Sequence, residues 1–402
     1  MTNSNAILAL ADQCVKCGLC LPQCPTYNLS LNENESPRGR IALIQAITSG
    51  QINVSRSLKQ HLDHCLMCRR CERVCPSQVQ YGKLVQQAHT MYTSLTPTTS
   101  LLGRLGLWLI EKPQRLKLMR RLLRSYQQSG VQALLRITGF LKILRLEQID
   151  ARLPEISKPF NTTPDSIKQK KSVALFTGCS QTIFDTNAIA SAHKLLSRLG
   201  YKVVIPDNQV CCGALHNTQG RTDKSQQLLR QNSKAFKQTE VETVLYLSSG
   251  CGAFIKEQSD NYDALGNFQE ITDFLVDDAT IEKLNFKPLQ NKIAVHMPCS
   301  QKNVLCQDNT AFELLQYIPE ITLFNLEQSG CCGAGGTTMV SHPKLADKVR
   351  QPLLEIIIHN DCFTVVTTNP GCQLHLQHGF KVQNSDTRVI HPVTLLAQQL
   401  EA

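Results

Sequence analysis

The sequence predicts an α + α/β protein, in which an N-terminal helical domain is followed by two repeated, cysteine-rich α/β modules. Two cysteine runs of identical spacing lie in the first 80 residues, and a helix-like stretch separates them. A second set of cysteines recurs with an offset of 120 or 121 residues in the last 230 residues. Four members of that set directly follow β-rich apolar runs, as expected for residues at strand ends in α/β units.

The composition is that of a globular protein with more than one domain. The chain has 402 residues, of which 42% are hydrophobic, enough for two or three separate cores. The N-terminal stretch has no basic region ahead of an apolar run, and no apolar stretch approaches the ~20 residues that span a bilayer. We therefore expect a cytoplasmic location, where thiols stay reduced. The 18 cysteines then indicate metal ligation or redox chemistry rather than disulfides.

The two early cysteine runs share the pattern C-x2-C-x2-C-x3-C-P. Bacterial-type ferredoxins hold cubane 4Fe-4S clusters with this spacing, taking three thiolates from one loop and the fourth from the other run. We therefore expect two such clusters, close enough together to form an electron relay. The expected ligands of cluster 1 are Cys14, Cys17, Cys20 and Cys75, and those of cluster 2 are Cys65, Cys68, Cys71 and Cys24.

Zinc is the alternative for these runs, but a zinc site uses two separated pairs of ligands and would leave a third loop cysteine unused. Between the runs, the stretch from Pro37 to Gly50 has the apolar spacing and the end signals of a capped helix. We infer a helical two-cluster domain over residues 1–95. Arg38 and Arg40, at the start of this helix, are expected either to donate hydrogen bonds toward a cluster or a partner, or to be solvated.

The basic charge of the chain is concentrated in a connector, residues 96–165. The formal net charge is +10, and the stretch 101–145 contains ten basic residues against one acid. Leucine and isoleucine recur there at helical spacing, interrupted by Pro113 and Gly130, which predicts two or three amphipathic helices. Such helices attach to an anionic membrane surface or to a partner subunit, or simply pack on their own protein with solvated arginines. No nucleic-acid recognition motif accompanies the charge, so we expect no binding of nucleic acid.

An internal repeat occupies the chain after a Pro-, Ser- and Thr-rich stretch at residues 153–166. It divides this part into two modules, residues 166–290 and 291–402. In each module β-rich runs alternate with helical stretches such as residues 186–200, which predicts a parallel sheet. The runs that predict strands are residues 172–178, 243–250, 292–298 and 362–371.

Each module carries a strand-end cysteine, a Cys-Cys-Gly sequence and a second strand-end cysteine. Adjacent cysteines are too close for a relaxed disulfide, so we interpret each Cys-Cys pair as a ligand pair. Strand-end residues converge at the carboxyl edge of a parallel sheet, which should bring the cysteines of each module together. The candidate ligands of a further cluster are Cys179, Cys211, Cys212 and Cys251 in the first module and Cys299, Cys331, Cys332 and Cys372 in the second. Cys306 and Cys362 lie outside the pattern, and we expect both to be buried and unreactive.

The chain resembles the iron-sulfur subunit of bacterial glycolate dehydrogenase (glycolate oxidase) along essentially its whole length. The resemblance rests on the paired cysteine runs, on CPTY and SPRGRIALI after the first run, and on CCGA, SSGCGAF and HPKLA in the modules. Similar modules occur in heterodisulfide reductases, in which a Cys-x-x-Cys closes each module and helps to hold a noncubane cluster. Here Ser248 and Asn369 stand in place of the first cysteine of that pair. The four remaining thiols suffice for an ordinary 4Fe-4S cluster but argue against disulfide-cleaving chemistry.

The resemblance implies an electron-transfer subunit. A partner subunit with FAD would oxidise glycolate, and electrons would pass through the clusters of this chain to a membrane quinone. The chain would have no catalytic residue of its own, and would lie in the cytoplasm or peripherally on the inner face of the cytoplasmic membrane. The sequence has no dinucleotide-binding fingerprint, which agrees with this division of labour. Three alternatives share these motifs: a component of a D-lactate or glycerol-3-phosphate dehydrogenase, a heterodisulfide reductase-like catalytic subunit, and a structural or binding module with degenerate repeats.

Overall fold

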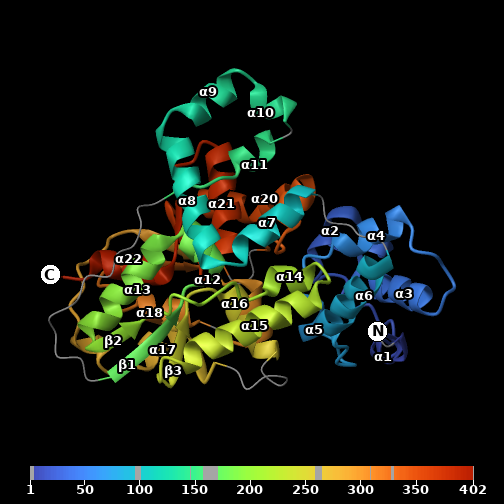
Figure 1. Ribbon diagram of the computed structural model, residues 1–402, viewed down its shortest axis with the longest axis horizontal. Coiled ribbons are helices and arrows are strands. Elements are labelled where there is room, and N and C mark those ends of the chain that lie inside the picture. The colour runs from blue at the N-terminus through green and yellow to red at the C-terminus, as the bar shows by residue number, and fades with distance from the viewer. Residues whose placement is uncertain are drawn as a thin grey trace.

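The computed structural model describes residues 4–95, 101–144, 146–156, 171–258, 265–307, 309–326 and 330–401. Figure 1 shows a helical N-terminal domain beside a larger α/β body, with a helical connector that projects from the body. This arrangement confirms the predicted α + α/β class. Residues 157–166 of the Pro-, Ser- and Thr-rich stretch lie outside the described part of the chain, as does Arg145 of the basic stretch.

Short helices around an apolar centre form the N-terminal domain. They are α1 (Ser4–Ala11), α2 (Pro25–Ser30), α3 (Pro37–Thr48), α4 (Arg56–Asp63), α5 (Arg70–Arg73) and α6 (Tyr81–Leu95), with a 3-10 turn η1 at Glu33–Glu35. The predicted helix between the cysteine runs is α3. Ser36 caps it, because Ser36 Oγ accepts a hydrogen bond from the N–H of Gly39 at 2.9 Å. Its residues Ile41 and Ile44 are buried in the centre of the domain.

The connector contains more helices than the sequence predicted, although it breaks at the predicted Pro113 and Gly130. Its helices are α7 (Leu101–Ile110), α8 (Pro113–Gln128), α9 (Val131–Ile137), α10 (Phe140–Ile143) and α11 (Glu147–Ala151). Leu116 on α8 is buried in the core of the first module, and Ile110 and Leu123 pack against that core. In Figure 1, α9 and α10 lie at the projecting end, away from the α/β body.

Each cysteine-rich module contains a four-stranded parallel sheet, as the sequence predicted, with strand orders β2-β1-β3-β4 and β6-β5-β7-β8. The strands are β1 (Lys171–Phe176), β2 (Tyr201–Val204), β3 (Thr243–Tyr246), β4 (Asn267–Glu270), β5 (Lys292–Val295), β6 (Thr322–Asn325), β7 (Thr364–Val366) and β8 (Arg388–Ile390). The inner strands pair in equivalent ways, with Ala174 opposite Val244 in the first sheet and Ala294 opposite Val365 in the second. The apolar runs predicted these inner strands. The edge strands were missed.

Helices pack against both sheets and join the two modules into one body. In the first module they are α12 (Gly178–Phe184), α13 (Thr186–Arg198), α14 (Ala214–Thr218), α15 (Thr222–Lys237), α16 (Ser249–Gln258) and α17 (Ile271–Asp277). A 3-10 turn η3 (Ile281–Lys283) precedes the second module, which contains the π-helical turn η4 (Gln301–Leu305), α18 (Thr310–Leu315), α19 (Thr338–Ser341), α20 (Pro343–His359), α21 (Pro370–Val382) and α22 (Pro392–Gln399). One apolar core contains Leu195 and Leu245 of the first module with Ile293 and Leu396 of the second. None of the helices in the described ranges is both long and apolar enough to cross a bilayer.

Candidate metal centres

The two early cysteine runs fold into loops with matching backbone conformations. Lys16 and Met67, each before the second cysteine of its run, have positive φ angles of 57° and 51°. Gly18 and Arg69, each after that cysteine, also have positive φ angles, of 89° and 58°. Left-handed residues turn the chain sharply, which lets the thiols of one loop face a common space. The repeated spacing in the sequence thus corresponds to a repeated loop structure.

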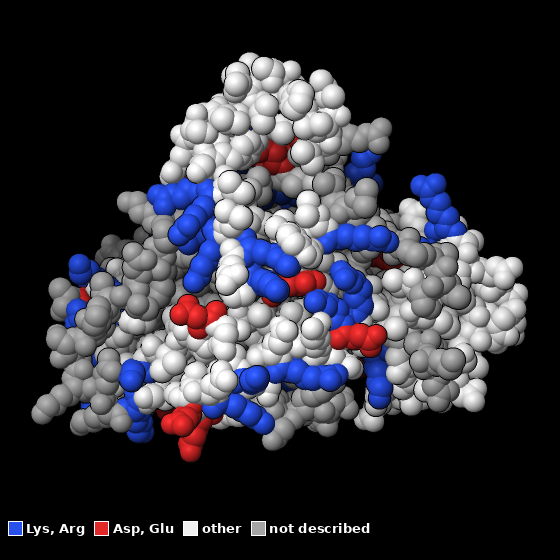
Figure 2. Space-filling model, viewed as in Figure 1, with Lys and Arg blue, Asp and Glu red and all other residues white. Residues whose placement is uncertain are grey.

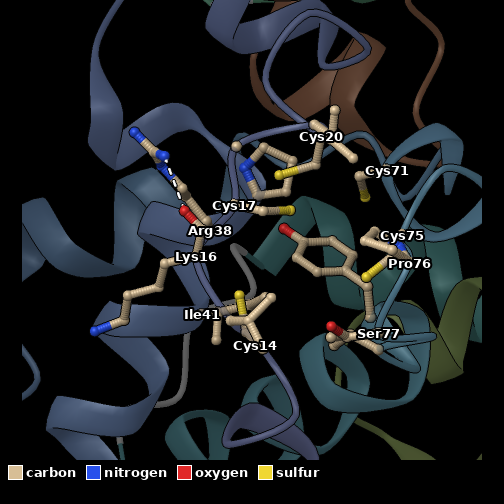
Figure 3. A pocket seen from close by; sticks show the side chains of 16 residues that line it. Cys14, Lys16, Cys17, Cys20, Arg38, Ile41, Cys71, Cys75, Pro76 and Ser77 are labelled. Atoms are coloured by element: carbon tan, nitrogen blue, oxygen red, sulfur yellow. Dashed lines mark hydrogen bonds between the residues drawn. The ribbon is translucent and has the colours of Figure 1, made fainter.

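The first loop surrounds a pocket that the second run completes. Figure 3 shows Cys14, Cys17, Cys20 and Cys75 around one space, with Cys71 beside them. The start of α3 forms another side of this pocket. The structure therefore places the last cysteine of the second run with the first three cysteines of the first run.

A second pocket collects the remaining thiols. Cys24, from the end of the first run, lines it together with Cys65, Cys68 and Cys71. Cys71 lines both pockets, so the two thiol sets are neighbours. Burial raises the pKa of Cys68 to about 12 and raises that of Cys71 as well, so ionising these thiols needs a nearby cation. Four thiols around one space fit the donor set of a 4Fe-4S cluster.

A buried ion-pair network lies behind Cys24. Arg40 is only 1% exposed, and its Nη2 donates to Glu35 Oε2 at 2.6 Å. Its Nη1 lies 3.9 Å from Cys24 Sγ. On the other side of the carboxylate, His61 Nδ1 and His64 Nδ1 lie 2.7 and 2.9 Å from Glu35 Oε1. The network fixes a positive charge next to one thiol of the second pocket.

The two arginines at the start of α3 therefore differ. Arg40 points toward a thiol, so its solvated alternative is wrong. Arg38 is partly exposed, pairs with Glu33 Oε1 at 2.6 Å and donates to the carbonyl of Lys16 at 3.2 Å. It thus supports the backbone of the first cysteine loop. Sequence reasoning missed Glu35, because an acid five residues before an arginine has no helical or strand periodicity that would pair the two.

The first cysteine-rich module brings its four cysteines together. Cys179 lies in the first turn of α12 after β1, and Cys251 lies in the first turn of α16 after β3. Cys211 Sγ lies 3.6 Å from Cys179 Sγ, and Cys212 follows on the same loop. Cys251 is within electrostatic range of both Cys179 and Cys212. All four thiols are buried.

The second module gathers the equivalent thiols and adds a histidine. Cys332 Sγ lies 2.7 Å from Cys372 Sγ. His296 directly follows β5, and its ligand atom lies within 4.8 Å of both of these sulfurs. Cys299 lies within electrostatic range of Cys331 and Cys372. This module therefore has five potential metal ligands, of which four were predicted.

His296 is a second site residue, after Glu35, that sequence reasoning missed. Its Nδ1 lies 3.0 Å from Thr367 Oγ1, which fixes the orientation of the ring. The equivalent position in the first module, 120 residues earlier, is Phe176. A comparison of the two repeats position by position, rather than at the cysteines alone, would have found this difference.

Glycine follows each Cys-Cys pair for a steric reason. Gly213 and Gly333 have φ angles of 96° and 74°. A Cβ on Gly213 would lie 2.9 Å from the carbonyl oxygen of Ser225, and one on Gly333 would lie 2.4 Å from that of Ala346. The N–H of each glycine is also directed at the first thiol of its pair, at 3.5 and 3.4 Å. A side chain at either position would displace the thiols.

Ser248 and Asn369 bond the backbone at the starts of helices rather than adding thiol ligands. Ser248 Oγ accepts a hydrogen bond from the N–H of Cys251 at 3.4 Å. Asn369 Oδ1 accepts from the N–H groups of Gly371 and Cys372 at 2.9 and 3.3 Å. Both side chains thus satisfy free N–H groups at the starts of α16 and α21. Each module keeps four thiols.

The second cysteine loop of the N-terminal domain packs directly on the second module. Cys68 contacts the apolar cluster that contains Cys331. Asn303 Nδ2 donates to the carbonyl of Cys68 at 2.7 Å, and Arg70 donates to the carbonyl of Gly330. The thiols of the second pocket and those of the second module therefore lie side by side across a domain interface.

The two cysteines outside the pattern differ from each other. Cys362 is buried, as expected. The expectation for Cys306 is wrong, because this residue is exposed. It ends η4 in a left-handed conformation with a φ angle of 55°, which turns the chain at the surface.

Three family models match the parts of the chain described above. The model for a 4Fe-4S dicluster domain matches residues 10–79, and that for a cysteine-rich domain matches residues 173–256 and 293–377. The model for the linker region of the glycolate oxidase iron-sulfur subunit matches residues 99–152. The matched ranges contain the cysteines of both pockets of the N-terminal domain, the projecting connector and the candidate ligand thiols of both modules.

Relatives that match nearly the whole chain show the family to which it belongs. The probable glycolate oxidase iron-sulfur subunit of Bacillus subtilis (strain 168) is 30% identical over 96% of this chain and 93% of its own length. The chain belongs to the glycolate oxidase iron-sulfur subunit family. The family member of Escherichia coli (strain K12) is also 30% identical, over 96% of this chain and 94% of its own. A component of the dihydromethanophenazine:CoB–CoM heterodisulfide reductase of Methanosarcina barkeri is 25% identical over 97% of this chain and 94% of its own.

Proposed function

We propose that this chain is the electron-transfer subunit of a glycolate dehydrogenase-type complex. In this proposal a partner subunit that carries FAD oxidises glycolate to glyoxylate, and this chain passes the electrons to a membrane quinone. The observation that carries the proposal is the pair of neighbouring thiol pockets, both of which Cys71 lines. Two clusters in pockets that share a wall would lie close enough together for electrons to pass from one to the other.

The residues of this chain hold the clusters and set their surroundings. When bound, a 4Fe-4S cluster supplies one-electron exchange. The two thiol sets ligate the clusters in the crossed pattern, with Cys75 completing the first set and Cys24 the second. Arg40 keeps a positive charge 3.9 Å from Cys24 Sγ, which stabilises negative charge at the second site and favours its reduced state.

The first pocket has the features of an entry point for electrons from a partner. Cys17 is exposed. Val15 and Leu19 on the same loop are 68% and 56% exposed, and exposed apolar residues around a functional group are typical of a contact surface. We assign the FAD subunit to this face. The second pocket lies behind it, toward the second module.

The module thiols extend the relay and are candidates for a third cluster. The second module is the better candidate, because its thiols adjoin Cys68 and because His296 adds a fifth donor. Two thiols of the first module lie in the first turns of α12 and α16. In the competing interpretation, the two modules hold no cluster and serve only as a structural scaffold.

The connector supports peripheral attachment to the inner face of the cytoplasmic membrane. At its projecting end, Ile137, Ile143 and Leu134 are 84%, 75% and 59% exposed. Figure 2 shows basic side chains gathered over α7 and α8, below this end. An apolar tip above a basic band is typical of elements that lie in a membrane interface, with anionic headgroups at the level of the basic residues.

The match to the glycolate oxidase linker model over residues 99–152 favours glycolate over D-lactate or glycerol-3-phosphate as the donor's substrate. The heterodisulfide reductase-like alternative, in which this chain is itself catalytic, is weakened by Ser248 and Asn369, whose side chains bond helix N–H groups. The test combines the full chain with its flavoprotein partners. We expect glycolate-dependent quinone reduction only from the combination, and glycolate oxidation by the isolated chain would contradict the proposal.

A further inference from the structure

A large cleft lies between α8 and the first cysteine-rich module. Its volume is about 730 Å³, which is within the range of sites for small organic ligands. Helix α8 forms one wall. The residues that follow β1 and β2, together with the first turns of α12 and α13, form the other. The cleft is separate from both thiol pockets of the N-terminal domain.

Four basic side chains line the cleft from one face of α8. They are Lys117, Arg120, Arg121 and Arg124, at the three- and four-residue spacings that place side chains on the same side of a helix. Asp207 is the acidic residue among those that line the cleft. It lies 3.6 Å from Lys117, and its side chain is almost fully exposed. The lining therefore has a surplus of positive charge, which Figure 2 shows over α8.

Two arginines in the cleft repel each other, and one of them has a buried donor without a partner. Burial, and then the charge of Arg124, lowers the pKa of Arg120. Arg124 Nε is buried without a hydrogen-bond partner among the described residues. Arg120 Nη2 makes a long hydrogen bond to Thr186 Oγ1, at 3.4 Å. An anion between the two guanidinium groups would satisfy the buried donor and remove their repulsion.

The opposite wall adds hydroxyl groups and apolar surface. Thr177, Thr182 and Thr186 line it with hydroxyl-bearing side chains. Thr186 is also the first residue of the 13-residue helix α13, whose N-terminus is capped by the Asp185 carboxylate. Ile189 and Val210 supply apolar contacts. A ligand that fits this lining has both an anionic group and an organic body.

We propose that this cleft binds a phosphate-bearing organic anion. A phosphate group offers three acceptor oxygens and up to two negative charges, which suits several arginines and hydroxyl groups better than a single carboxylate does. The phosphate has two possible sources, a soluble nucleotide or the headgroup of an anionic phospholipid, since α8 leads to the apolar projecting end. The proposal goes beyond electron transfer and does not depend on it.

Calorimetric titration of the full chain with inorganic pyrophosphate and with ADP tests the soluble source. Cosedimentation with vesicles of phosphatidylglycerol, compared with vesicles of phosphatidylcholine, tests the lipid source. The discriminating variant combines Arg120→Gln with Arg124→Gln. The matched control combines Arg230→Gln with Lys234→Gln, which removes two exposed charges from α15, outside the cleft. We expect the cleft variant to bind about tenfold more weakly, and the control to bind as the unmodified chain does.

The arms of the experiment separate the two sources. Weakened binding of ADP or pyrophosphate assigns the soluble source, and weakened binding of phosphatidylglycerol vesicles without any response to the soluble probes assigns the headgroup. Arg121 is exposed, so Arg121→Gln should leave folding intact and still weaken binding severalfold. Equal binding by the unmodified chain, the cleft variants and the control would overturn the proposal. Failure of every probe to bind would overturn it too.

Discussion

Arg40 Nη2 donates to Glu35 Oε2 at 2.6 Å, and the side chains of this ion pair are only 1% and 8% exposed. The same guanidinium lies 3.9 Å from Cys24 Sγ. One buried cation thus links a carboxylate to a thiol of the second pocket. A buried ion pair is vulnerable to the loss of either member, because the remaining charge has neither a partner nor water around it.

Arg40→Gln should therefore destabilise the N-terminal domain strongly. Removing one member of a buried pair costs about 3 kcal/mol of the free energy of unfolding, and chemical denaturation measures this loss. Arg38→Gln is the control, because Arg38 is two residues away on the same helix and its ion pair with Glu33 is partly exposed. We expect little change in the control. Equal losses in the two variants would contradict the account of the buried network.

Gly333→Ala should destabilise the second module. The new Cβ would lie 2.4 Å from the carbonyl oxygen of Ala346, in a residue with a φ angle of 74°. Gly330→Ala is the matched control, because its φ angle is also positive, at 112°, but its Cβ would meet no atom of the described residues within 4 Å. Both variants lose about 1 kcal/mol from the left-handed backbone, and Gly333→Ala should lose at least as much again from the clash. Similar midpoints of thermal unfolding for the two variants would contradict the steric explanation, because they would show that the loop around residue 333 moves to accommodate the new Cβ.

The buried carboxyl of Glu270 should make the stability of the first module depend on pH. Burial raises the pKa of Glu270 from 4.5 to about 8. The folded chain then keeps this group protonated at neutral pH, whereas the unfolded chain ionises it. The raised pKa adds to the free energy of unfolding, and this contribution is complete below about pH 4.5. It is lost as the pH rises to about 8, by about 1.4 kcal/mol per pH unit.

Glu270→Gln imitates the protonated form and should flatten this dependence. The amide oxygen can still accept the hydrogen bond from the N–H of Thr272 that caps α17. Unfolding measured at several values between pH 5 and pH 8 compares the variant with Glu282→Gln, in which an exposed acid is replaced. If Glu270→Gln loses as much stability over this interval as the unmodified chain does, the carboxyl is not the source.

The sequence predicted those parts of the fold that depend on local pattern. The inner strands were found because continuous apolar runs reflect burial on both faces of a sheet. The edge strands were missed because their side chains are less buried, as in β2 and β6, and their short runs have no clear period. The extra break in the connector at Gly139 depends on the left-handed conformation of this residue, which directly precedes α10.

Of the candidate site, spacing predicted the thiols but not their neighbours. The positions of the cysteines are visible as a repeat, and the structure brings each predicted set together. Glu35 holds Arg40 near Cys24 and contacts His61 and His64 from α4 and its end. His296 lies beside Cys332 and Cys372, and no local period in the sequence connects these residues. The contact between Asn303 and Cys68 spans 235 residues of sequence. Such pairings arise from domain packing, which a single sequence does not encode as a pattern.

Iron content tests the number of clusters. Chain purified without oxygen should contain about eight irons if only the two thiol pockets are filled, since each cubane holds four. Cys14→Ser and Cys65→Ser should each reduce the content, because each removes one ligand of a different pocket. An iron content of about twelve, of which about four irons remain when both substitutions are combined, would place a cluster in the modules. Bound zinc without visible absorbance would contradict the iron-sulfur assignment.

The most direct test of the relay uses Cys71→Ser in the complex with the FAD-bearing subunits, because Cys71 lines both pockets. Stopped-flow absorbance follows bleaching of the flavin by glycolate and reduction of the quinone in the same sample. Cys362→Ser is the control, since Cys362 is a buried thiol that lines neither pocket. We predict that Cys71→Ser abolishes quinone reduction and leaves flavin bleaching largely intact, while Cys362→Ser retains both. Quinone reduction at the unmodified rate by an assembled Cys71→Ser complex would contradict the account.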